Sequence, residues 1–149
     1  MRRQAEASEL IRIGESPEGR DILLDPSAAH AWEAMRAAAA SSGVELVAIS
    51  GFRSIARQAE IVGEKLRAGE SMEAVLEVLA APGYSEHHTG RAVDVGTPGA
   101  APLTEDFERS EAFRWLRAHA SEHGFRLSYP RGNAHGIAYE PWHWRFAPD

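Results

Sequence analysis

Ser85-Glu86-His87-His88-Thr89-Gly90-Arg91-Ala92-Val93-Asp94 is the stretch around which the rest of the chain is organised. It places His87 and Asp94 seven positions apart, a separation that would send their side chains to opposite faces of a continuous strand. Gly90 permits the chain to turn between them. We therefore expect His87 on a loop and Asp94 on a strand over residues 91–95, with the two side chains converging. A surface histidine and a solvated aspartate would explain this pair alone equally well.

A second cluster, Glu140-Pro141-Trp142-His143-Trp144, lies far downstream. Two histidines and one aspartate can hold zinc and leave its fourth position open for water, as catalytic zinc sites do. His143 would complete the set begun by the first pair, and Glu140 would be left close to the metal as a general base. Pro141 interrupts strand hydrogen bonding, so a kink there would let Glu140 and His143 reach one cleft. An edge strand on which the tryptophans pack is the simpler interpretation of this segment taken alone.

Three further residues are candidates for contact with a substrate. Arg53, in Ser50-Gly51-Phe52-Arg53-Ser54, lies where a predicted strand meets a predicted helix. Its guanidinium could polarise a scissile carbonyl or bind a carboxylate, although a surface salt bridge is the commoner role of an arginine. Gln58 lies about one helical turn further on and could face the same cleft or solvent. Ser85 could hydrogen-bond the substrate or merely cap its loop.

The composition is that of one globular domain, with 44% hydrophobic and 26% charged residues among 149. We expect a single domain over residues 1–149, in which residues 1–20 form an irregular arm with at most one short strand. The net charge of −6 argues against nucleic-acid binding, which usually requires a basic stripe. There is no cysteine, so disulfides and thiolate zinc ligands are excluded, and imidazole or carboxylate must hold any metal.

No apolar run approaches the length of about 18 residues that spans a bilayer, so we expect no membrane segment. Met1-Arg2-Arg3 begins like a signal peptide, but polar residues interrupt any apolar continuation. We therefore expect no signal peptide in this chain, and we expect a monomer.

Helix and strand signals occur along most of the chain. Asp25, Ser54 and Ser71 are typical N-cap residues, and each precedes apolar residues at helical spacing. The predicted helices cover residues 26–42, 55–68, 72–79 and 110–122, and the predicted strands cover residues 22–24, 44–49, 91–95, 125–127 and 142–146. On the third helix, the residues predicted to face inward are Met72, Val75, Leu76 and Leu79.

The motifs above occur together in one known family. They are residues 50–54 with Gln58, the Ser-x-His-x-x-Gly-x-Ala-x-Asp pattern at residues 85–94, Tyr129-Pro130-x-Gly132, and residues 136–144 with Glu140-Pro141-Trp142-His143. In these segments the chain resembles the zinc D-alanyl-D-alanine carboxypeptidases of the VanY type, in the group that includes lysostaphin-like and hedgehog-type domains. The resemblance runs from about residue 25 to the C-terminus, with all motifs in the expected order.

The resemblance implies an α+β fold in which a small antiparallel sheet carries the zinc site and helices flank it. The implied zinc ligands are His87, Asp94 and His143. Glu140 would be the catalytic base, and Arg53 would steady the scissile carbonyl. Gln58 and Ser85 would help to hold the end of the peptide.

The resemblance also implies a substrate, the stem peptides of peptidoglycan, from which the terminal D-alanine would be removed. An L,D-carboxypeptidase, a D-Ala-D-Ala dipeptidase and a cell-wall endopeptidase of the same fold are alternatives. A zinc-stabilised binding module is the non-enzyme alternative, although a purely structural site needs neither Glu140 nor Arg53. The family implies the periplasm or cell envelope, but without a signal peptide the cytoplasm stays open. The role of His135, in the loop over residues 132–136, also stays open.

Overall fold

The structure, a computed structural model, describes residues 1–148. Within them the α-helices are α1 (Pro26–Ser41), α2 (Ile55–Arg67), α3 (Met72–Val78) and α4 (Glu111–His119). The 3-10 helices are η1 (Glu86–Thr89), η2 (Glu105–Arg109) and η3 (Ala120–His123). The strands are β1 (Ile11–Glu15), β2 (Asp21–Leu24), β3 (Val47–Ser50), β4 (Ala92–Gly96), β5 (Phe125–Leu127) and β6 (His143–Phe146). In this part of the chain no helix has the length and apolar character needed to cross a membrane.

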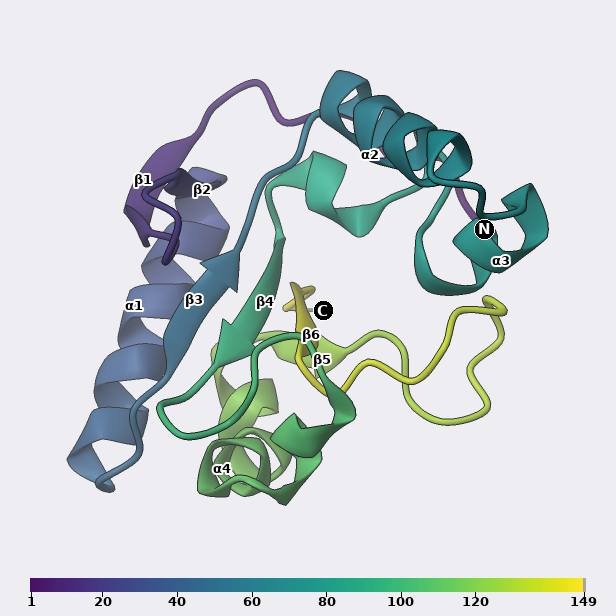
Figure 1. Cartoon of the computed structure of the whole chain (residues 1–149). Coiled ribbons are helices and arrows are strands. Elements are labelled where there is room, and N and C mark those ends of the chain that lie inside the picture. Colours follow the sequence, from purple (N-terminus) through teal and green to yellow (C-terminus); the bar gives the residue numbers. More distant parts are fainter. Residues whose placement is uncertain (149) are drawn as a thin grey trace.

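Strands β3, β4, β6 and β5 form, in that order, an antiparallel sheet (Figure 1). Asp94 on β4 lies directly opposite His143 on β6, so these two side chains emerge on the same face of the sheet. The neighbouring pair, Val93 and Trp144, emerges on the other face. A small antiparallel sheet with helices around it confirms the predicted fold class. The register of β4 on β6 also brings two of the predicted zinc ligands together.

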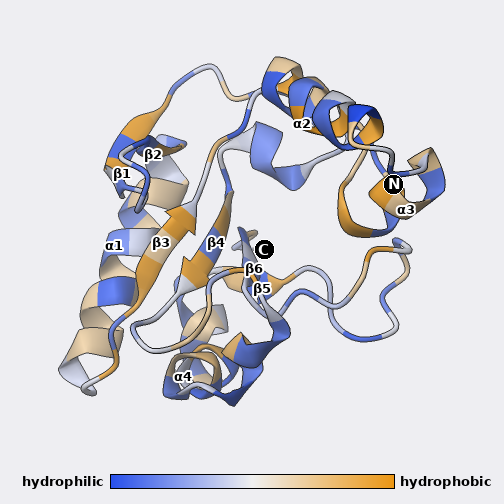
Figure 2. Ribbon diagram, viewed as in Figure 1, coloured by the Kyte–Doolittle hydropathy of each residue, from blue (hydrophilic) through white to orange (hydrophobic). Residues whose placement is uncertain are grey.

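The hydrophobic core lies on the face of the sheet that carries Val93 and Trp144. Trp32 and Met35 of α1 and Leu116 of α4 pack there, and all of these side chains are buried. Figure 2 shows strongly apolar residues concentrated on β3 and β4. Since each fully buried large apolar side chain contributes roughly 1.5–3 kcal/mol, this face stabilises the fold. The opposite face can therefore carry polar groups.

The first three α-helices begin where the sequence predicts, and α4 begins one residue later than predicted. The side chains of Asp25, Ser54 and Ser71 each accept a hydrogen bond from the backbone N–H three residues later, at 2.8, 3.0 and 3.1 Å. Ser110 caps α4 in the same way, at 3.1 Å. The fourth helix is shorter than predicted, because α4 ends at His119 and the chain continues as the tighter 3-10 helix η3.

The N-terminal segment contains the one short strand for which the sequence analysis allowed. This strand is β1, which pairs with β2 in an antiparallel hairpin. Residues closer to the N-terminus are also held in place. The N–H of Gln4 donates to the carbonyl of Gly83, and the N–H of Ala7 donates to that of His88, each at 2.8 Å. These contacts join segments far apart in the sequence, which local hydropathy does not reveal.

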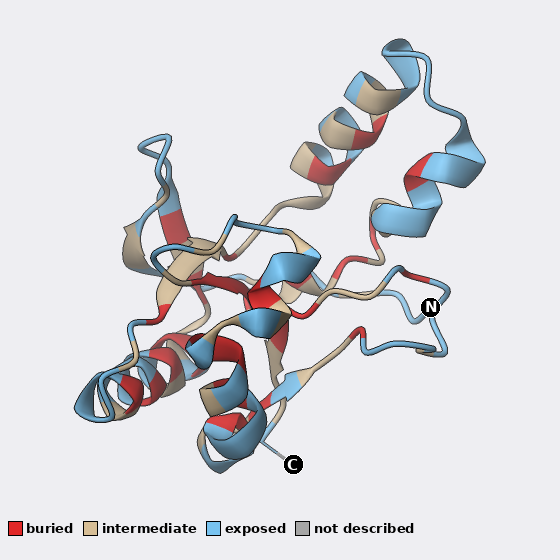
Figure 3. Ribbon diagram, turned by 60° about the horizontal axis from the view of Figure 1, so that its bottom comes forward, coloured by how far each residue is buried: buried red, intermediate tan, exposed pale blue. Residues whose placement is uncertain are grey.

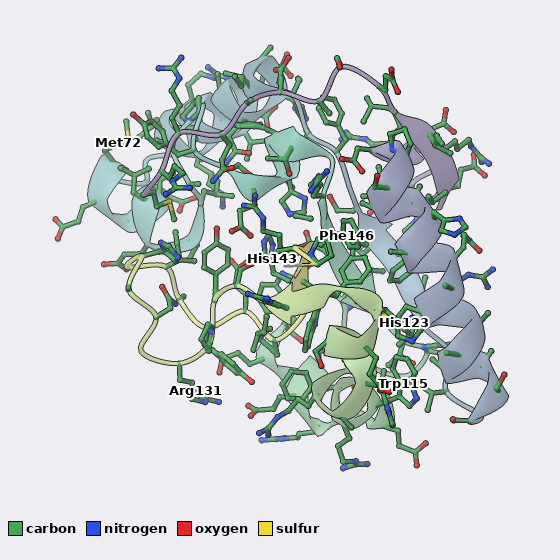
Figure 4. All side chains as sticks on the ribbon, turned by 180° about the vertical axis from the view of Figure 1, so that it is seen from behind. Met72, Trp115, His123, Arg131, His143 and Phe146 are labelled. Atoms are coloured by element: carbon green, nitrogen blue, oxygen red, sulfur yellow. The ribbon has the colours of Figure 1, made fainter. Side chains whose placement is uncertain are left out.

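The predicted inward face of α3 is wrong at two of its four positions. Val75 is buried and Leu79 is half-buried, but Met72 and Leu76 are 49% and 38% exposed. Figure 3 shows α3 as mostly exposed with one short buried stretch, and Figure 4 places Met72 at the outer edge of the molecule. A helix as short as α3, which packs mainly against α2, buries a single row of side chains.

Gly90 is the position at which an added side chain should disturb the fold most clearly. Its φ is 70°, and a Cβ there would lie 2.9 Å from the backbone nitrogen of Asp25, which donates to the Gly90 carbonyl at 2.8 Å. The left-handed conformation alone costs an L-residue about 1–2 kcal/mol. We expect Gly90→Ala to destabilise the protein by more than this, because the added Cβ also meets the backbone of Asp25. Gly99→Ala is the matched control, since Gly99 has a φ of 87° with open space around it. Chemical denaturation compares the two variants, and equal losses would show that the Asp25 contact relaxes without cost.

Candidate metal centre and active site

His87 is oriented by the short helix that carries it. Ser85 caps η1, its Oγ accepting from the N–H of His87 at 3.2 Å, and Gly90 ends it in the left-handed region. Nδ1 of His87 lies 2.7 Å from the carbonyl oxygen of Gly51. Because a carbonyl can only accept, Nδ1 donates, and the lone pair is on Nε2, 3.2 Å from Oδ1 of Asp94. The turn predicted at Gly90 is confirmed, with His87 before it and Asp94 on β4.

His143 reaches the same point from the neighbouring strand. The chain turns tightly through Pro141, and the N–H of His143 donates to the carbonyl of Glu140 at 3.3 Å, so the predicted kink is confirmed. Nδ1 of His143 lies 3.2 Å from Oδ1 of Asp94. Its Nε2 faces the other way and lies 2.9 Å from Oε1 of Glu86. The ring therefore presents Nδ1, and not Nε2, to the other two predicted ligands.

The three groups fit a zinc ion in number, chemistry and spacing. His87, Asp94 and His143 are 5%, 5% and 3% exposed, and one ligand atom of each lies within 4.8 Å of the other two. With zinc bonds of about 2.0–2.2 Å, neighbouring atoms of a tetrahedral site lie about 3.3–3.6 Å apart. Oδ1 of Asp94 is 3.2 Å from each imidazole nitrogen, close to that spacing. Two imidazoles and one carboxylate are also a typical donor set of catalytic zinc.

Glu140 lies beside this cluster but outside the ligand set. Its Oε1 is 3.8 Å from Nδ1 of His143. Burial raises the pKa of Glu140 to about 7, and the carboxylates of Asp94 and Glu86 add to the rise, while His143 and Arg53 oppose it. A carboxyl group with a pKa near neutrality can both accept and release a proton, as a general base must.

Arg53 is fixed where β3 leads into α2, as the sequence predicts. Its N–H donates to the carbonyl of His87 at 3.0 Å, and its carbonyl accepts from Nδ1 of His88 at 2.7 Å. Nη1 of Arg53 donates to Oε1 of Gln58 at 3.0 Å, and Nε2 of Gln58 donates to the carbonyl of Ala80 at 2.7 Å. Gln58 is buried at the site and does not face solvent. It therefore orients the guanidinium of Arg53.

A cavity of about 170 Å³ joins these groups. Its wall contains every predicted site residue: Arg53, Gln58, Ser85, His87, Asp94, Glu140 and His143. Apolar side chains complete the wall, among them Val78, Leu103 and Ile137. His135 does not line this cavity, since its ring packs edge-on against Tyr129, at 5.7 Å between centroids, and borders a neighbouring apolar pocket. His143 is 3% exposed, and Figure 4 labels it near the centre of the molecule.

Glu86 belongs to the site although the sequence analysis assigned it no role. Besides His143, it accepts hydrogen bonds from Oγ of Ser128 at 2.6 Å and from Nη1 of Arg145 at 3.3 Å. Burial alone would raise the pKa of Glu86, but the bonds from His143 and Ser128 and the charges of His143 and Arg145 hold it at about 2. Its position beside His87 was the one local signal that could have pointed to it.

His88 and Tyr129 complete the surroundings of the site. His88 is fully buried, and its Nε2 accepts from the N–H of Gly83 at 3.0 Å while Nδ1 holds the backbone of Arg53. The ring of Tyr129 lies 4.8 Å from that of His143, between centroids, and burial raises the pKa of its hydroxyl. The sequence identified Tyr129 within a family motif but gave no sign of this contact.

Comparison with known proteins connects this chain to one family. Residues 21–149 match the profile of VanY, D-alanyl-D-alanine carboxypeptidase. The D-alanyl-D-alanine carboxypeptidase of Enterococcus faecalis is 32% identical over 136 residues, which represent 85% of this chain and 47% of that protein. The chain thus spans less than half the length of the first curated relatives that it matches.

Solved structures agree with this match. The LdcB LD-carboxypeptidase is similar with a TM-score of 0.84 and 33% identity, over 96% of this chain and 70% of that one. A variant of the D,D-pentapeptidase VanY from the VanB-type resistance cassette, in complex with Zn(II), gives a TM-score of 0.72 and 29% identity over 96% and 80%. VanYB in complex with D-Ala-D-Ala gives the same TM-score and identity over 96% and 78%. Since the family profile covers nearly the whole sequence, the chain belongs to the VanY family of D-alanyl-D-alanine carboxypeptidases.

Proposed function

We propose that this chain is a zinc-dependent D,D-carboxypeptidase that removes the terminal D-alanine from peptidoglycan stem peptides. The observation that carries the proposal is the position of Glu140. Its carboxylate lies 3.8 Å from the nitrogen of His143 that faces the other predicted ligands, and it is surplus to a complete ligand set. A purely structural zinc site needs no such group. The similar VanY structures contain Zn(II) in one case and D-Ala-D-Ala in another, which supports both the metal and the class of substrate.

His87, Asp94 and His143 would hold the zinc. When bound, zinc supplies a Lewis acid that polarises the scissile carbonyl and acidifies the attacking water. Glu140 accepts a proton from that water as it attacks the carbonyl carbon. It then passes the proton to the amine of the departing D-alanine as the peptide bond breaks.

Arg53 and Ser85, which line the same cavity, would bind the substrate. Because Gln58 holds Nη1 of Arg53, the planar guanidinium is oriented before a substrate arrives. We assign it to the scissile carbonyl oxygen, where a fixed cation stabilises the charge that develops during attack. Ser85 lines the cavity, and its hydroxyl would help to hold the end of the peptide.

An L,D-carboxypeptidase is the second candidate, because the LD-carboxypeptidase LdcB is more similar in structure than VanYB, with TM-scores of 0.84 and 0.72. Both activities release a terminal D-alanine, and they differ in the configuration of the residue before the scissile bond. A dipeptidase or an endopeptidase would use the same catalytic side chains to cleave a different substrate or a different bond of the stem peptide.

Mass spectrometry of defined stem peptides distinguishes these candidates. The zinc-loaded chain is incubated with a pentapeptide ending in D-Ala-D-Ala and with a tetrapeptide in which one D-alanine follows an L-configured centre. We expect the pentapeptide to lose one alanine. Loss from the tetrapeptide alone would establish the L,D activity instead, and release of intact D-Ala-D-Ala would indicate a dipeptidase. If the chain binds zinc but cleaves neither peptide, the binding-module alternative takes precedence.

Arg53→Lys tests whether the guanidinium contacts the substrate. Lysine keeps the charge but lacks the planar fork, so it cannot bind Gln58 and the substrate at once. We expect kcat/KM to fall about 10²-fold, the lower end for loss of an oxyanion donor, with zinc content and thermal stability preserved. Arg57→Lys is the matched control, since Arg57 pairs with Glu60 at 3.0 Å on the outside of α2, and its kinetics should not change. Unchanged kinetics in Arg53→Lys would leave Arg53 with a structural role only.

A further inference from the structure

Glu86 is a half-buried carboxylate that the chemistry proposed above does not use. Oε1 accepts from Nε2 of His143 at 2.9 Å and from Oγ of Ser128 at 2.6 Å, while Oε2 lies 3.3 Å from Nη1 of Arg145. The side chain of Glu86 is 13% exposed. Both carboxylate oxygens of Glu86 therefore accept hydrogen bonds. The bonds from Ser128 and His143 are shorter than the bond from Arg145.

The backbone explains why these groups meet. His143 and Arg145 are two positions apart on β6, so their side chains emerge on the same face of the sheet. Ser128 directly follows β5, the strand paired with β6. Glu86 is the first residue of η1 and immediately precedes His87. One short helix thus carries a predicted zinc ligand and the carboxylate that contacts another.

The contact determines which nitrogen of His143 can bind a metal. A carboxylate can only accept, so Nε2 of His143 must carry a proton to make the bond with Glu86. In a neutral imidazole the lone pair is then on Nδ1, the nitrogen that lies 3.2 Å from Oδ1 of Asp94. A hydrogen bond of this kind fixes both the tautomer and the plane of a metal-binding histidine.

We propose that Glu86 is a positioning residue, which holds His143 with Nδ1 directed at the metal while Ser128 and Arg145 hold Glu86. The inference rests on the zinc site of the proposed function. The alternative is that Glu86 only ties η1 to the sheet through its ion pair with Arg145. The geometry argues against that alternative, because the bond to buried His143 is shorter than the one to Arg145, whose side chain is 29% exposed.

Zinc affinity, measured against a competing chelator, tests the proposal without reference to peptidase activity. We expect Glu86→Ala to raise the dissociation constant for zinc about 10–100-fold, as loss of a ligand's hydrogen-bond partner typically does. Ser128→Ala and Arg145→Met are the controls, because each removes one contact of Glu86 and leaves the bond to His143, so their losses should be much smaller. Glu86→Gln keeps the shape and an accepting oxygen, and its affinity should lie between Glu86→Ala and wild type. It replaces Glu86→Ala if the alanine variant does not fold.

Nitrogen-15 NMR of the zinc-loaded chain gives a signature that a merely structural role would not change. In wild type, Nε2 of His143 should carry a proton that exchanges slowly with water, and in Glu86→Ala this proton should exchange fast. Wild-type affinity and slow exchange in Glu86→Ala would overturn the proposal, as would equal losses of affinity in Arg145→Met. If the wild-type chain itself binds no zinc, the proposed metal site fails and this inference fails with it. Equal zinc binding by wild type and Glu86→Ala refutes the inference alone.

Discussion

Glu140→Gln is expected to lower kcat/KM for the stem peptide by about 10⁴-fold, at the upper end of the range for general acid–base groups. The amide keeps the shape of the side chain but cannot accept a proton. Glu140 would serve both the attack of water and the departure of the amine, so both steps lose their catalyst. Zinc content and the melting temperature should stay near wild type, because Glu140 is outside the ligand set. Steady-state kinetics with metal analysis on the same sample measure both quantities.

Glu73→Gln is the control for this substitution, since Glu73 lies exposed in the first turn of α3 and outside the cavity. Its kinetics should equal those of wild type. Loss of zinc from Glu140→Gln would show that Glu140 is a ligand. Full activity with zinc retained would show that another group is the base.

His143→Ala should abolish both zinc binding and peptidase activity. The substitution removes one of three predicted ligands, and with it the imidazole that both Asp94 and Glu86 contact. Purified wild type should contain about one zinc per chain, and the variant close to none, by metal analysis after dialysis. His135→Ala is the matched control, because His135 lies outside the cluster and its removal should leave zinc in place.

Retention of one zinc by His143→Ala would refute the ligand assignment. Circular dichroism of the metal-free proteins distinguishes zinc loss caused by the missing ligand from zinc loss caused by unfolding. A folded variant that lacks zinc supports the assignment directly. Loss of zinc from His135→Ala as well would show that the metal lies elsewhere or depends on the whole loop over residues 132–136.

The sequence predicted best the features that local chemistry controls. The N-caps at Asp25 and Ser54 depend on a hydrogen bond to a residue three positions away, so their signals are complete within a few residues. The turn at Gly90 likewise depends on one residue that tolerates a positive φ. These short signals were enough to place His87 before the turn and Asp94 on a strand after it.

The features that escaped prediction depend on distant parts of the chain. Glu86 meets Ser128 and His143 from 42 and 57 positions away, and these contacts exist only because β6 pairs with β4 in one register. The exposed face of α3 was mispredicted for a related reason. Helical spacing identified an apolar row that includes Met72, but not whether a second element covers it. The register between strands and the packing of one element over another are properties of the assembled fold, and no short segment specifies them.

The proposal that His87, Asp94 and His143 hold the zinc of a peptidase is tested most directly by diffraction from crystals of the zinc-loaded chain. Data collected on both sides of the zinc absorption edge locate the metal independently of any assumption about its ligands. We predict one anomalous peak in the cavity, at about 2.0–2.2 Å from Nε2 of His87, Oδ1 of Asp94 and Nδ1 of His143, with Glu140 outside bonding distance. A peak bound by Glu140 or by Nε2 of His143, or one that lies away from these residues, would contradict it.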